Sequence, residues 1–265
     1  MATPTEGATG PLDQRVAVIT GGGRGIGREL AFAMASAGAA VVISSRTGTD
    51  LDHVVSTVQA QGGRALAVVA DATERADAVR PVKAAMEAFG RVDVLVNNVG
   101  GSAPGNQDPF EGDLDAIEAV LTLNLTSAFW ITHAALPHMR SQGYGRVISI
   151  GSGASRRAVA SWAYTAAKHG LVGFTTQLAK IAGPHAITVN CLCPGWTNTS
   201  LVDFERLARA RGVGVAEARA AAEADSAQGR ILEPEELAPL AVLLASPAGG
   251  AITGQTIGVD GGFQL

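Results

Sequence analysis

Cysteine is scarce in this chain of 265 residues, which contains only Cys191 and Cys193. Two cysteines cannot build a disulfide framework and are too few to ligate a structural metal, so we expect no metal site. Both fall in an apolar run with the pattern of a strand. We expect the two thiols to be buried and reduced, on opposite faces of that strand, in a cytoplasmic protein.

The chain also lacks an excess of basic charge and any long apolar run. Its net charge of −4 gives no electrostatic footprint for nucleic acid or an anionic membrane, and we expect neither as a partner. No run reaches the roughly 18–20 apolar residues of a membrane span, because the best candidate, "LAPLAVLLASPAGGA", is interrupted by Pro and Gly. The first residues have no basic and no apolar region, so we expect no secretory signal there and a disordered tail over residues 1–13.

Apolar residues, by contrast, make up 47% of the sequence, and it contains 33 glycines. Short apolar runs alternate with alanine-rich amphipathic stretches, and most runs are continuously apolar, as in parallel strands covered on both faces. This alternation predicts a single α/β domain over residues 14–265, a Rossmann-type doubly wound parallel sheet of about seven strands with helices on both faces. The predicted strands are residues 15–20, 39–44, 65–70, 92–97, 146–151, 186–193 and 255–260.

One long segment, residues 196–230, interrupts the alternation between the sixth strand and the last helix. Its pattern is helical. Long insertions beyond the carboxyl ends of α/β strands form lids over substrate pockets, and we favour a helical substrate lid. The alternative is a solvated helix face, with which its arginines are equally compatible: Arg206, Arg209, Arg211 and Arg219.

A glycine-rich turn, "TGGGRGIG" at residues 20–27, joins the first predicted strand to the first predicted helix. Gly21, Gly25 and Gly27 allow a tight turn that brings backbone N–H groups close to a pyrophosphate, whose charge the helix N-terminus favours. A glycine cluster alone is a weak signal. Its position between a strand and a helix indicates a dinucleotide-binding site.

The second predicted strand ends in Ser44, Ser45 and Arg46, without the acidic residue that would meet a free ribose. Arg46, together with Arg24 in the glycine turn, places two cations where a 2′-phosphate would lie. Either arginine alone could be a surface charge. The two together predict that NADP(H) is preferred, with NAD(H) possible.

A tyrosine and a lysine stand four positions apart in "YTAAKHG", residues 164–170, within a predicted helix. Residues at this spacing share a helix face, so Lys168 can lie beside Tyr164. A neighbouring ammonium stabilises a phenolate, which suits Tyr164 to donate a proton to a carbonyl oxygen or to accept one from an alcohol. The pair alone carries little information, because helix surfaces commonly contain both residues.

From Arg15 to the C-terminus the motifs together resemble those of the classical short-chain dehydrogenase/reductases. Their order and placement along the chain carry the resemblance more than any one of them. The matching segments are the glycine turn from Thr20, Asp71 in "DAT", "NNVG" at 97–100, Asn124 in "LTLNLTSAF", Ser152 in "SIGSGAS", Tyr164 and Lys168, "PG" at 194–195 and "VDGG" at 259–262.

The resemblance implies a hydride-transferring oxidoreductase whose catalytic set is Asn124, Ser152, Tyr164 and Lys168. The Ser152 hydroxyl would hydrogen-bond the reacting oxygen, and Asn124 would hold a water that links Lys168 to solvent. Members of the family commonly form tetramers, so we expect a homotetramer that uses the helices around 112–139 and 162–183. The residues expected to bind the cofactor are Gly21, Arg24, Gly25, Ile26, Gly27, Ser45, Arg46, Asp71, Ala72, Asn98, Gly100, Tyr164, Lys168, Pro194, Gly195, Thr197 and Thr199.

The loop between Ser152 and Tyr164 is one residue shorter than the commonest spacing in the family. We expect a tightened loop that leaves Ser152 in place. Two other serines, Ser149 within the strand and Ser155 beyond the expected position, are weaker candidates for the same role.

The sequence resembles two subgroups in different parts. The 3-oxoacyl-acyl-carrier-protein reductases share the glycine turn and the Tyr-Lys core, although His185 stands where those enzymes carry a basic residue that helps to dock the carrier. The D-3-hydroxybutyrate dehydrogenases share the lid region. Their carboxylate-binding residues are replaced by Ala154 and Glu205, and an acid there disfavours a small 3-hydroxy acid. We expect Arg156 and Arg157 near the pocket mouth. They could attract an anionic substrate, or they could be a solvated pair on a surface loop.

Three functions remain open. The leading hypothesis is an NADP(H)-dependent carbonyl reductase that acts on a small-molecule ketone or 3-oxoacyl-type compound. The second is an NAD(P)-linked dehydrogenase that oxidises a secondary, sugar or cyclic alcohol. The third is a dinucleotide-sensing protein without catalysis, which the presence of Ser152, Tyr164 and Lys168 disfavours.

Overall fold

The centre of the protein is one sheet of seven parallel strands in the order β3-β2-β1-β4-β5-β6-β7. The computed structural model describes residues 10–102, 105 and 108–265. This order confirms the predicted Rossmann-type fold, because the chain winds outward from β1 in one direction and then, from β4, in the other. The strands are β1 Val16–Thr20, β2 Ala40–Ser45, β3 Arg64–Val69, β4 Val94–Asn97, β5 Gly145–Ile150, β6 Ile187–Pro194 and β7 Thr256–Val259.

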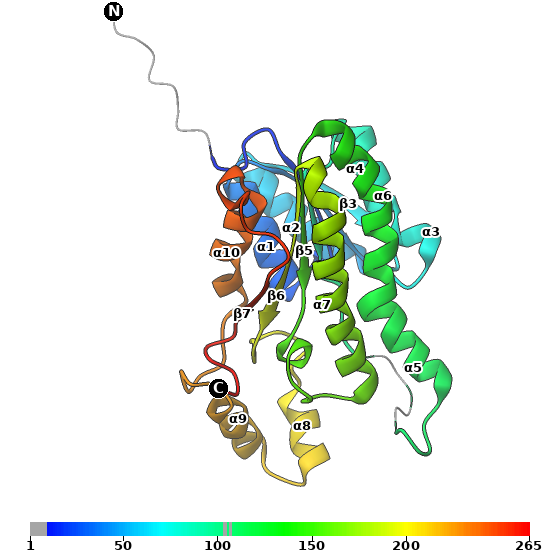
Figure 1. Cartoon of the computed structure of the whole chain (residues 1–265). Coiled ribbons are helices and arrows are strands. Elements are labelled where there is room, and N and C mark those ends of the chain that lie inside the picture. The colour runs from blue at the N-terminus through cyan, green and yellow to red at the C-terminus, as the bar shows by residue number, and fades with distance from the viewer. Residues whose placement is uncertain (1–9, 103–104, 106–107) are drawn as a thin grey trace, which may run out of the picture.

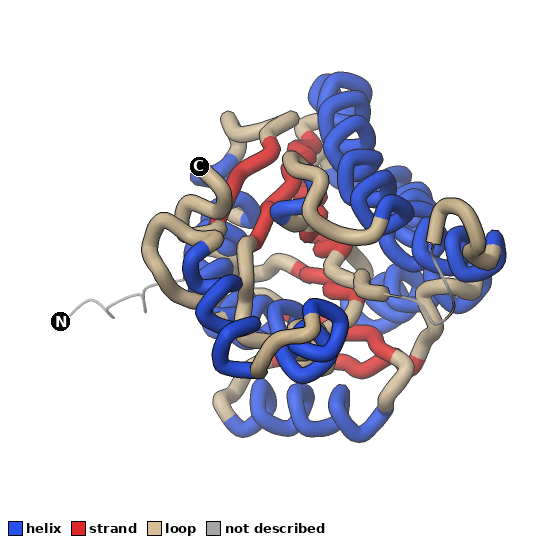
Figure 2. The backbone as a smooth tube through the Cα atoms, turned by 90° about the horizontal axis from the view of Figure 1, so that it is seen from below, coloured by secondary structure: helices blue, strands red, loops and turns tan. Residues whose placement is uncertain are grey.

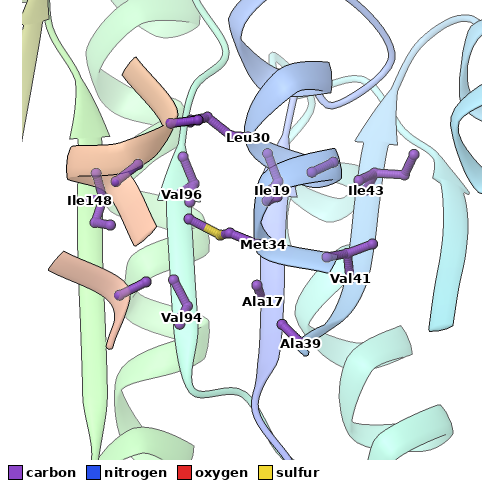
Figure 3. Packing of buried hydrophobic residues seen from close by; sticks show 14 of the residues in the cluster. Ala17, Ile19, Leu30, Met34, Ala39, Val41, Ile43, Val94, Val96 and Ile148 are labelled. Atoms are coloured by element: carbon purple, nitrogen blue, oxygen red, sulfur yellow. The ribbon is translucent and has the colours of Figure 1, made fainter. Parts of the chain in front are cut away.

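The central strands are buried on both faces, which is why their sequences are continuously apolar. Side chains alternate along a strand, so β1 divides its residues between two cores. Ala17 and Ile19 pack into one core, and Val16 and Val18 pack into the other. Figure 3 shows the first core, in which Met34 of the first helix lies over these strands.

Helices cover both faces of the sheet, as Figures 1 and 2 show. One face carries α1, α2 and α10, whose side chains join the core around Ile19. The opposite face carries α4, α6 and α7, which join the core around Val18. The helices are α1 Gly25–Ser36, α2 Gly48–Ala60, α3 Arg75–Ala78, α4 Arg80–Phe89, α5 Leu114–Leu121, α6 Ser127–Gln142, α7 Trp162–Ala182, α8 Phe204–Arg211, α9 Val215–Ala224 and α10 Ala238–Ala245.

Helices α5 and α6 are continuous through a π-helical turn, Thr122–Thr126. Over Leu114–Gln142 this rod is long and apolar enough to cross a membrane by length and composition, with 39% of its most apolar window buried inside the protein. The core helix of a globular domain passes the same test. Here Ile131 and Met139 are buried in the core on the α4, α6 and α7 face of the sheet.

The 196–230 insertion contains two helices, α8 and α9, which extend beyond the main body at the lower end of Figure 1. They pack against each other through the buried Ala208 of α8 and the buried Ala218 and Ala222 of α9. The chain end returns to this region, because Ser226 pairs with Phe263 in an isolated antiparallel bridge.

Two details differ from the sequence prediction. The tail was expected to reach residue 13, and of this segment residues 1–9 lie outside the described residues. Leu12, however, is fully buried and its N–H donates to Ala37 O at 2.9 Å, so the ordered domain begins before residue 14. The second concerns Cys191 and Cys193, which are buried with their sulfurs 3.9 Å apart. Residues two positions apart in a strand share a face, and the expectation of opposite faces was wrong.

Candidate active site

A cleft of about 1300 Å³ lies at the carboxyl ends of the strands, where each loop leaves the sheet. A pocket for one small ligand typically measures about 300–1,000 Å³, so this cleft has room for a dinucleotide and a substrate. Of the residues predicted for the site, all line the cleft except Gly27 and Asn124. The sequence motifs, which are spread over most of the chain, therefore meet in one place.

The glycine turn adopts the backbone that its sequence requires. Gly21 and Gly25 have φ angles of 66° and 53°, in the left-handed region that favours glycine. Gly27 lies beneath the turn, where a Cβ would be 2.3 Å from Gly21 O. Gly27 therefore permits the first helix to pack closely on the turn and does not itself line the cleft, contrary to the prediction of a cofactor contact.

At the end of β2, Ser45 and Arg46 line the same cleft as Arg24 of the turn. The Ser45 hydroxyl donates to Thr47 O at 3.0 Å. Both guanidinium groups belong to exposed residues. The cleft also contains Asp50, whose Cβ lies 2.9 Å from where a Cβ on Gly23 would be. No sequence motif pointed to this acid.

Asp71, at the end of β3, is held as a carboxylate. Partial burial raises its pKa, but hydrogen bonds from Thr73 N at 2.9 Å and Thr73 Oγ1 at 2.7 Å, with the charge of Arg46, outweigh this and keep the pKa below its usual value. Asn98, at the end of β4, donates through Nδ2 to Thr20 O and Gly21 O, so it ties the glycine turn to the neighbouring loop.

Tyr164 and Lys168 both belong to α7 and line the cleft. The Lys168 Nζ lies 5.5 Å from the centre of the Tyr164 ring and donates to Ile150 O at 2.9 Å. Lys168 is only 3% exposed, so its ammonium is fixed by this carbonyl and by its surroundings rather than by bulk water. The helical spacing has thus placed a phenol and an ammonium on one face, as predicted.

Of the three candidate serines, Ser152 lines the cleft, whereas Ser149 and Ser155 are buried and do not line it. The short loop begins with one 3₁₀ turn, Gly153–Ser155, which is the tightening expected from its length. The Ser152 Oγ accepts a hydrogen bond from Ala154 N at 3.2 Å. Its own hydroxyl hydrogen therefore remains available to a ligand oxygen in the cleft.

Asn124 lies behind the cleft in the π-helical turn and is 2% exposed. Its Nδ2 donates to Gly101 O at 2.8 Å and Val120 O at 2.9 Å, and its Oδ1 accepts from Gly101 N at 2.9 Å. One amide hydrogen therefore holds the loop after β4, and the other bonds to the preceding turn of the helix. A Cβ on Gly100 would be 2.9 Å from this Oδ1 and 3.0 Å from Lys168 Nζ, so Asn124 and Lys168 approach the same point of that loop. Single π-helical turns are often found at functional sites.

The segment after β6 closes the cleft from the other side. Pro194, Gly195, Thr197 and Thr199 all line it. The Thr197 hydroxyl donates to Gly195 O at 3.1 Å, and Thr199 approaches the glycine turn, with its Cγ2 3.3 Å from where a Cβ on Gly25 would be. These four residues, which were predicted to bind the cofactor, thus lie opposite the glycine turn.

The substrate end of the cleft differs from the sequence prediction. Arg156 and Arg157 do not line it, and Arg157 donates to the backbone of Gln264. Glu205 also lies outside the cleft and pairs with Arg209, so the argument that it would repel a carboxylate does not hold. Residues that the sequence did not single out as cleft-lining are present instead, among them Val159, Leu201, Arg206, Leu207, Arg211, Asp225, Phe263 and Gln264.

A parallel doubly wound sheet with a glycine turn, a Tyr-Lys pair and a serine in one cleft defines a dinucleotide-dependent oxidoreductase. The sequence model of the family described as short chain dehydrogenase matches residues 15–210. The chain belongs to the short-chain dehydrogenase family. It is therefore an NAD(P)-dependent oxidoreductase that acts on CH–OH groups.

Named relatives cover nearly the whole chain. The short-chain reductase protein NovJ of Streptomyces niveus is 38% identical over 99% of both chains. A 3-oxoacyl-[acyl-carrier-protein] reductase of Synechocystis is 35% identical over 96% of this chain and 98% of its own. A D-beta-hydroxybutyrate dehydrogenase of Cupriavidus necator is 34% identical over 95% and 98%. The two subgroups that the motifs resemble are thus both confirmed as relatives.

A solved structure from Beutenbergia cavernae superposes with a TM-score of 0.84 at 36% identity, over 94% of this chain and 96% of its own. It is provisionally assigned as an NAD(P)-dependent gluconate 5-dehydrogenase and contains NADP at low occupancy. Relatives with this fold thus bear names for both carbonyl reduction and alcohol oxidation.

Proposed function

We propose that this protein is an NADP(H)-dependent carbonyl reductase that acts on a ketone or 3-oxoacyl-type compound. The observation that carries the proposal is the convergence of Ser152, Tyr164 and Lys168 in the cleft that also contains the glycine turn. A protein that only sensed a dinucleotide would have no use for a proton donor beside a buried ammonium.

The residues of this chain supply the proton and the electrostatic stabilisation. When bound, the reduced cofactor supplies a hydride to the carbonyl carbon, which leaves negative charge on the carbonyl oxygen. The Ser152 hydroxyl donates a hydrogen bond to that oxygen as the charge develops. Tyr164 transfers its phenolic proton to the same oxygen and becomes a phenolate, which the ammonium of Lys168 stabilises.

The preference for NADP(H) is supported by the end of β2. Ser45 and Arg46 stand where an NAD-specific site would present an acid, and Arg24 lines the same cleft. The carboxylates Asp50 and Asp71 line the cleft as well, and Asp71 is engaged by Thr73. Two guanidinium groups and a serine hydroxyl suit a 2′-phosphate, to which arginine can donate two parallel hydrogen bonds.

The second candidate function is oxidation of a secondary, sugar or cyclic alcohol with NAD(P). The names of the Beutenbergia cavernae structure and the Cupriavidus necator relative favour it. The same residues would work in reverse, with the phenolate of Tyr164 accepting the alcohol proton. The ratio of oxidised to reduced cofactor in the cell decides the direction.

We further propose that the protein acts as a cytoplasmic homotetramer without nucleic-acid or membrane partners. Support for the assembly comes from apolar side chains exposed on the two helices predicted to form it, with Phe129 of α6 50% exposed and Ile181 of α7 59% exposed. Sedimentation equilibrium tests this assembly, and a monomer at all concentrations would contradict it.

The function is tested by measuring consumption of NADPH, with NADH in parallel, over a panel of ketones, β-keto esters and diketones. The variant Tyr164→Phe is measured beside the parent protein. Turnover with NADPH that falls by about 10²–10⁴ in the variant, while the cofactor still binds, supports the proposal. Faster turnover with NADH contradicts the roles of Arg24 and Arg46. Cofactor binding without turnover of any ketone or alcohol favours the sensing hypothesis.

A further inference from the structure

The four arginines of helices α8 and α9 fall into two groups. Arg209 pairs with Glu205 at 3.8 Å, and Arg219 pairs with Glu223 at 2.9 Å. Neither of these two lines the cleft. The other two, Arg206 and Arg211, both line the cleft, and their side chains have no hydrogen-bond or ion-pair partner among residues 10–102, 105 and 108–265.

The geometry of α8 explains this division. Residues four apart share a helix face, so Leu207 and Arg211 lie together. Arg206 comes one position before Leu207 and lines the cleft as well. Glu205 and Arg209, also four apart, lie together on another face, where they pair with each other. The acid that would neutralise a cleft arginine is therefore turned away from the cleft.

The cleft that these two arginines line also contains apolar side chains. Trp196, Leu207 and Phe263 line the same cleft as Arg206 and Arg211. The acid at this end, Asp225, accepts a hydrogen bond from Trp196 Nε1 at 3.0 Å, so part of its acceptor capacity is already used. The local charge of the two arginines and Asp225 is positive by one unit, in a protein whose net charge is −4.

We propose that Arg206 and Arg211 form an anion-binding subsite for the substrate, and that the substrate class is a carbonyl compound with an apolar body and a remote carboxylate or phosphate. This inference rests on the proposed function, because it assigns the substrate of the same cleft. A guanidinium can donate two parallel hydrogen bonds to either anion. The apolar side chains that line the same cleft would pack on the body of the substrate, while the exposed arginines would meet its charged end.

The first experiment compares a homologous series of methyl-ketone carboxylic acids of increasing chain length with their methyl esters. Each ester keeps the reacting carbonyl and loses the charge. We expect the parent protein to prefer the acid, by kcat/KM, at least about tenfold at one chain length, and Arg206→Gln and Arg211→Gln each to lower the acid-to-ester ratio about three- to tenfold.

The matched control is Arg209→Gln, which removes the same charge from the same helix at a position outside the cleft. We expect it to leave the acid-to-ester ratio within about twofold of the parent, as for other exposed ion pairs. A fall in the ratio as large as that in Arg206→Gln would show a general field effect and overturn the proposal. A ratio near one in the parent protein at every chain length would also overturn it.

A third outcome separates the substrate from the cofactor. If the substitutions raised KM for NADPH and left the acid-to-ester ratio unchanged, Arg206 and Arg211 would belong to the cofactor site, and the proposal would be wrong. In that case turnover of the esters would still support the proposed function.

A binding measurement does not depend on turnover. Octanoate, octyl phosphate and octanol are titrated by calorimetry into the cofactor-saturated protein, which distinguishes a carboxylate from a phosphate. We expect one of the two anions to bind at least about tenfold more tightly than octanol, with that advantage lost in the double variant Arg206→Gln/Arg211→Gln. Equal binding of all three molecules would overturn the subsite. If no carbonyl compound were turned over while the anion preference held, the proposed function would fail and the subsite would stand.

Discussion

The Ser155 Oγ accepts a hydrogen bond from the Ser152 backbone N–H at 3.1 Å, and this bond orients the Ser152 hydroxyl toward the cleft by fixing the turn that carries it. The two serines are three positions apart and have different surroundings. Ser155 is 3% exposed, whereas Ser152 lines the cleft. One serine hydroxyl of this turn is therefore available to a ligand in the cleft, and the other stabilises the turn.

The first prediction separates these two serines. Ser152→Ala should lower kcat about 10²- to 10³-fold, because it removes a hydrogen-bond donor to the developing oxyanion. It should also lower the free energy of unfolding by about 0.5–2 kcal/mol, because Ser152 is the N-cap of the turn. Ser155→Ala should lower the free energy of unfolding by about 0.5–1.5 kcal/mol, because it leaves the Ser152 N–H without its partner, and it should change kcat far less than Ser152→Ala does. Steady-state kinetics and urea unfolding of both variants check this. An equal loss of kcat in the two variants would contradict the assignment.

The second prediction concerns the cofactor. Ser45→Asp places a carboxylate at the end of β2, where like charge would repel a 2′-phosphate and an acid would accept hydrogen bonds from a free ribose. We expect kcat/KM for NADPH to fall at least about tenfold relative to that for NADH.

The control for this prediction is Ser56→Asp, which adds the same charge to an exposed position of α2 outside the cleft. It should leave the ratio of the two cofactors close to that of the parent. A cofactor ratio that is the same in all three proteins would show that the end of β2 does not select the cofactor.

The third prediction uses two glycines with different surroundings. A Cβ at Gly27 would be 2.3 Å from Gly21 O, whereas a Cβ at Gly173 of α7 would meet nothing within 4 Å. Gly27→Ala should destabilise the protein by about 1–3 kcal/mol and weaken cofactor binding, because the helix must move away from the turn. Gly173→Ala should stabilise it by about 0.5–1 kcal/mol, because alanine favours a helix. Thermal unfolding with and without NADPH measures both effects.

The fourth prediction is a pH dependence. Glu236 accepts two hydrogen bonds from Arg230, at 2.6 and 2.7 Å, and one from Glu233 N at 2.7 Å, which lower its pKa from 4.5 to about 2. A carboxyl whose pKa is lower in the folded state stabilises the protein fully above its unfolded pKa, and this contribution is lost as the pH falls through the folded value. The parent should therefore exceed Glu236→Gln in stability above pH 4.5, with the difference shrinking toward pH 2.

Urea unfolding of the parent and Glu236→Gln over this pH range checks the fourth prediction. The effect should be small, because both side chains of the pair are at least one-third exposed and solvent screens their attraction. A difference that stayed constant as the pH fell would show that Glu236 acts through packing rather than charge.

The sequence predicted the sheet well, because a strand covered on both faces must be apolar throughout. All seven strands begin and end within one residue of the predicted ranges, except that β4 begins at Val94, two residues later than predicted. The motif residues also meet as predicted, since the carboxyl ends of parallel strands lie at one edge of the sheet.

The substrate end could not be predicted in the same way. Whether Arg206 or Arg209 faces the cleft depends on how α8 rotates about its axis, and the sequence of the insertion does not fix that rotation. Arg157 was expected near the pocket mouth because of its position in the chain. Its side chain instead donates a hydrogen bond to the backbone of Gln264, which is far away in sequence. Contacts between distant segments also explain why Leu12, in a polar terminal stretch, is buried.

The strand order has a consequence for how the chain folds as it is synthesised. β1 lies between β2 and β4, with Val18 paired to Val42 on one side and to Leu95 on the other. The first three strands leave the ribosome before β4. The edge of β1 that pairs with β4 therefore stays unpaired and apolar until β4 has been synthesised. Pairing between distant segments is slow, and exposed strand edges promote aggregation. The interval between the synthesis of Thr20 and that of Val94 is therefore when a nascent chain of this protein most needs a chaperone.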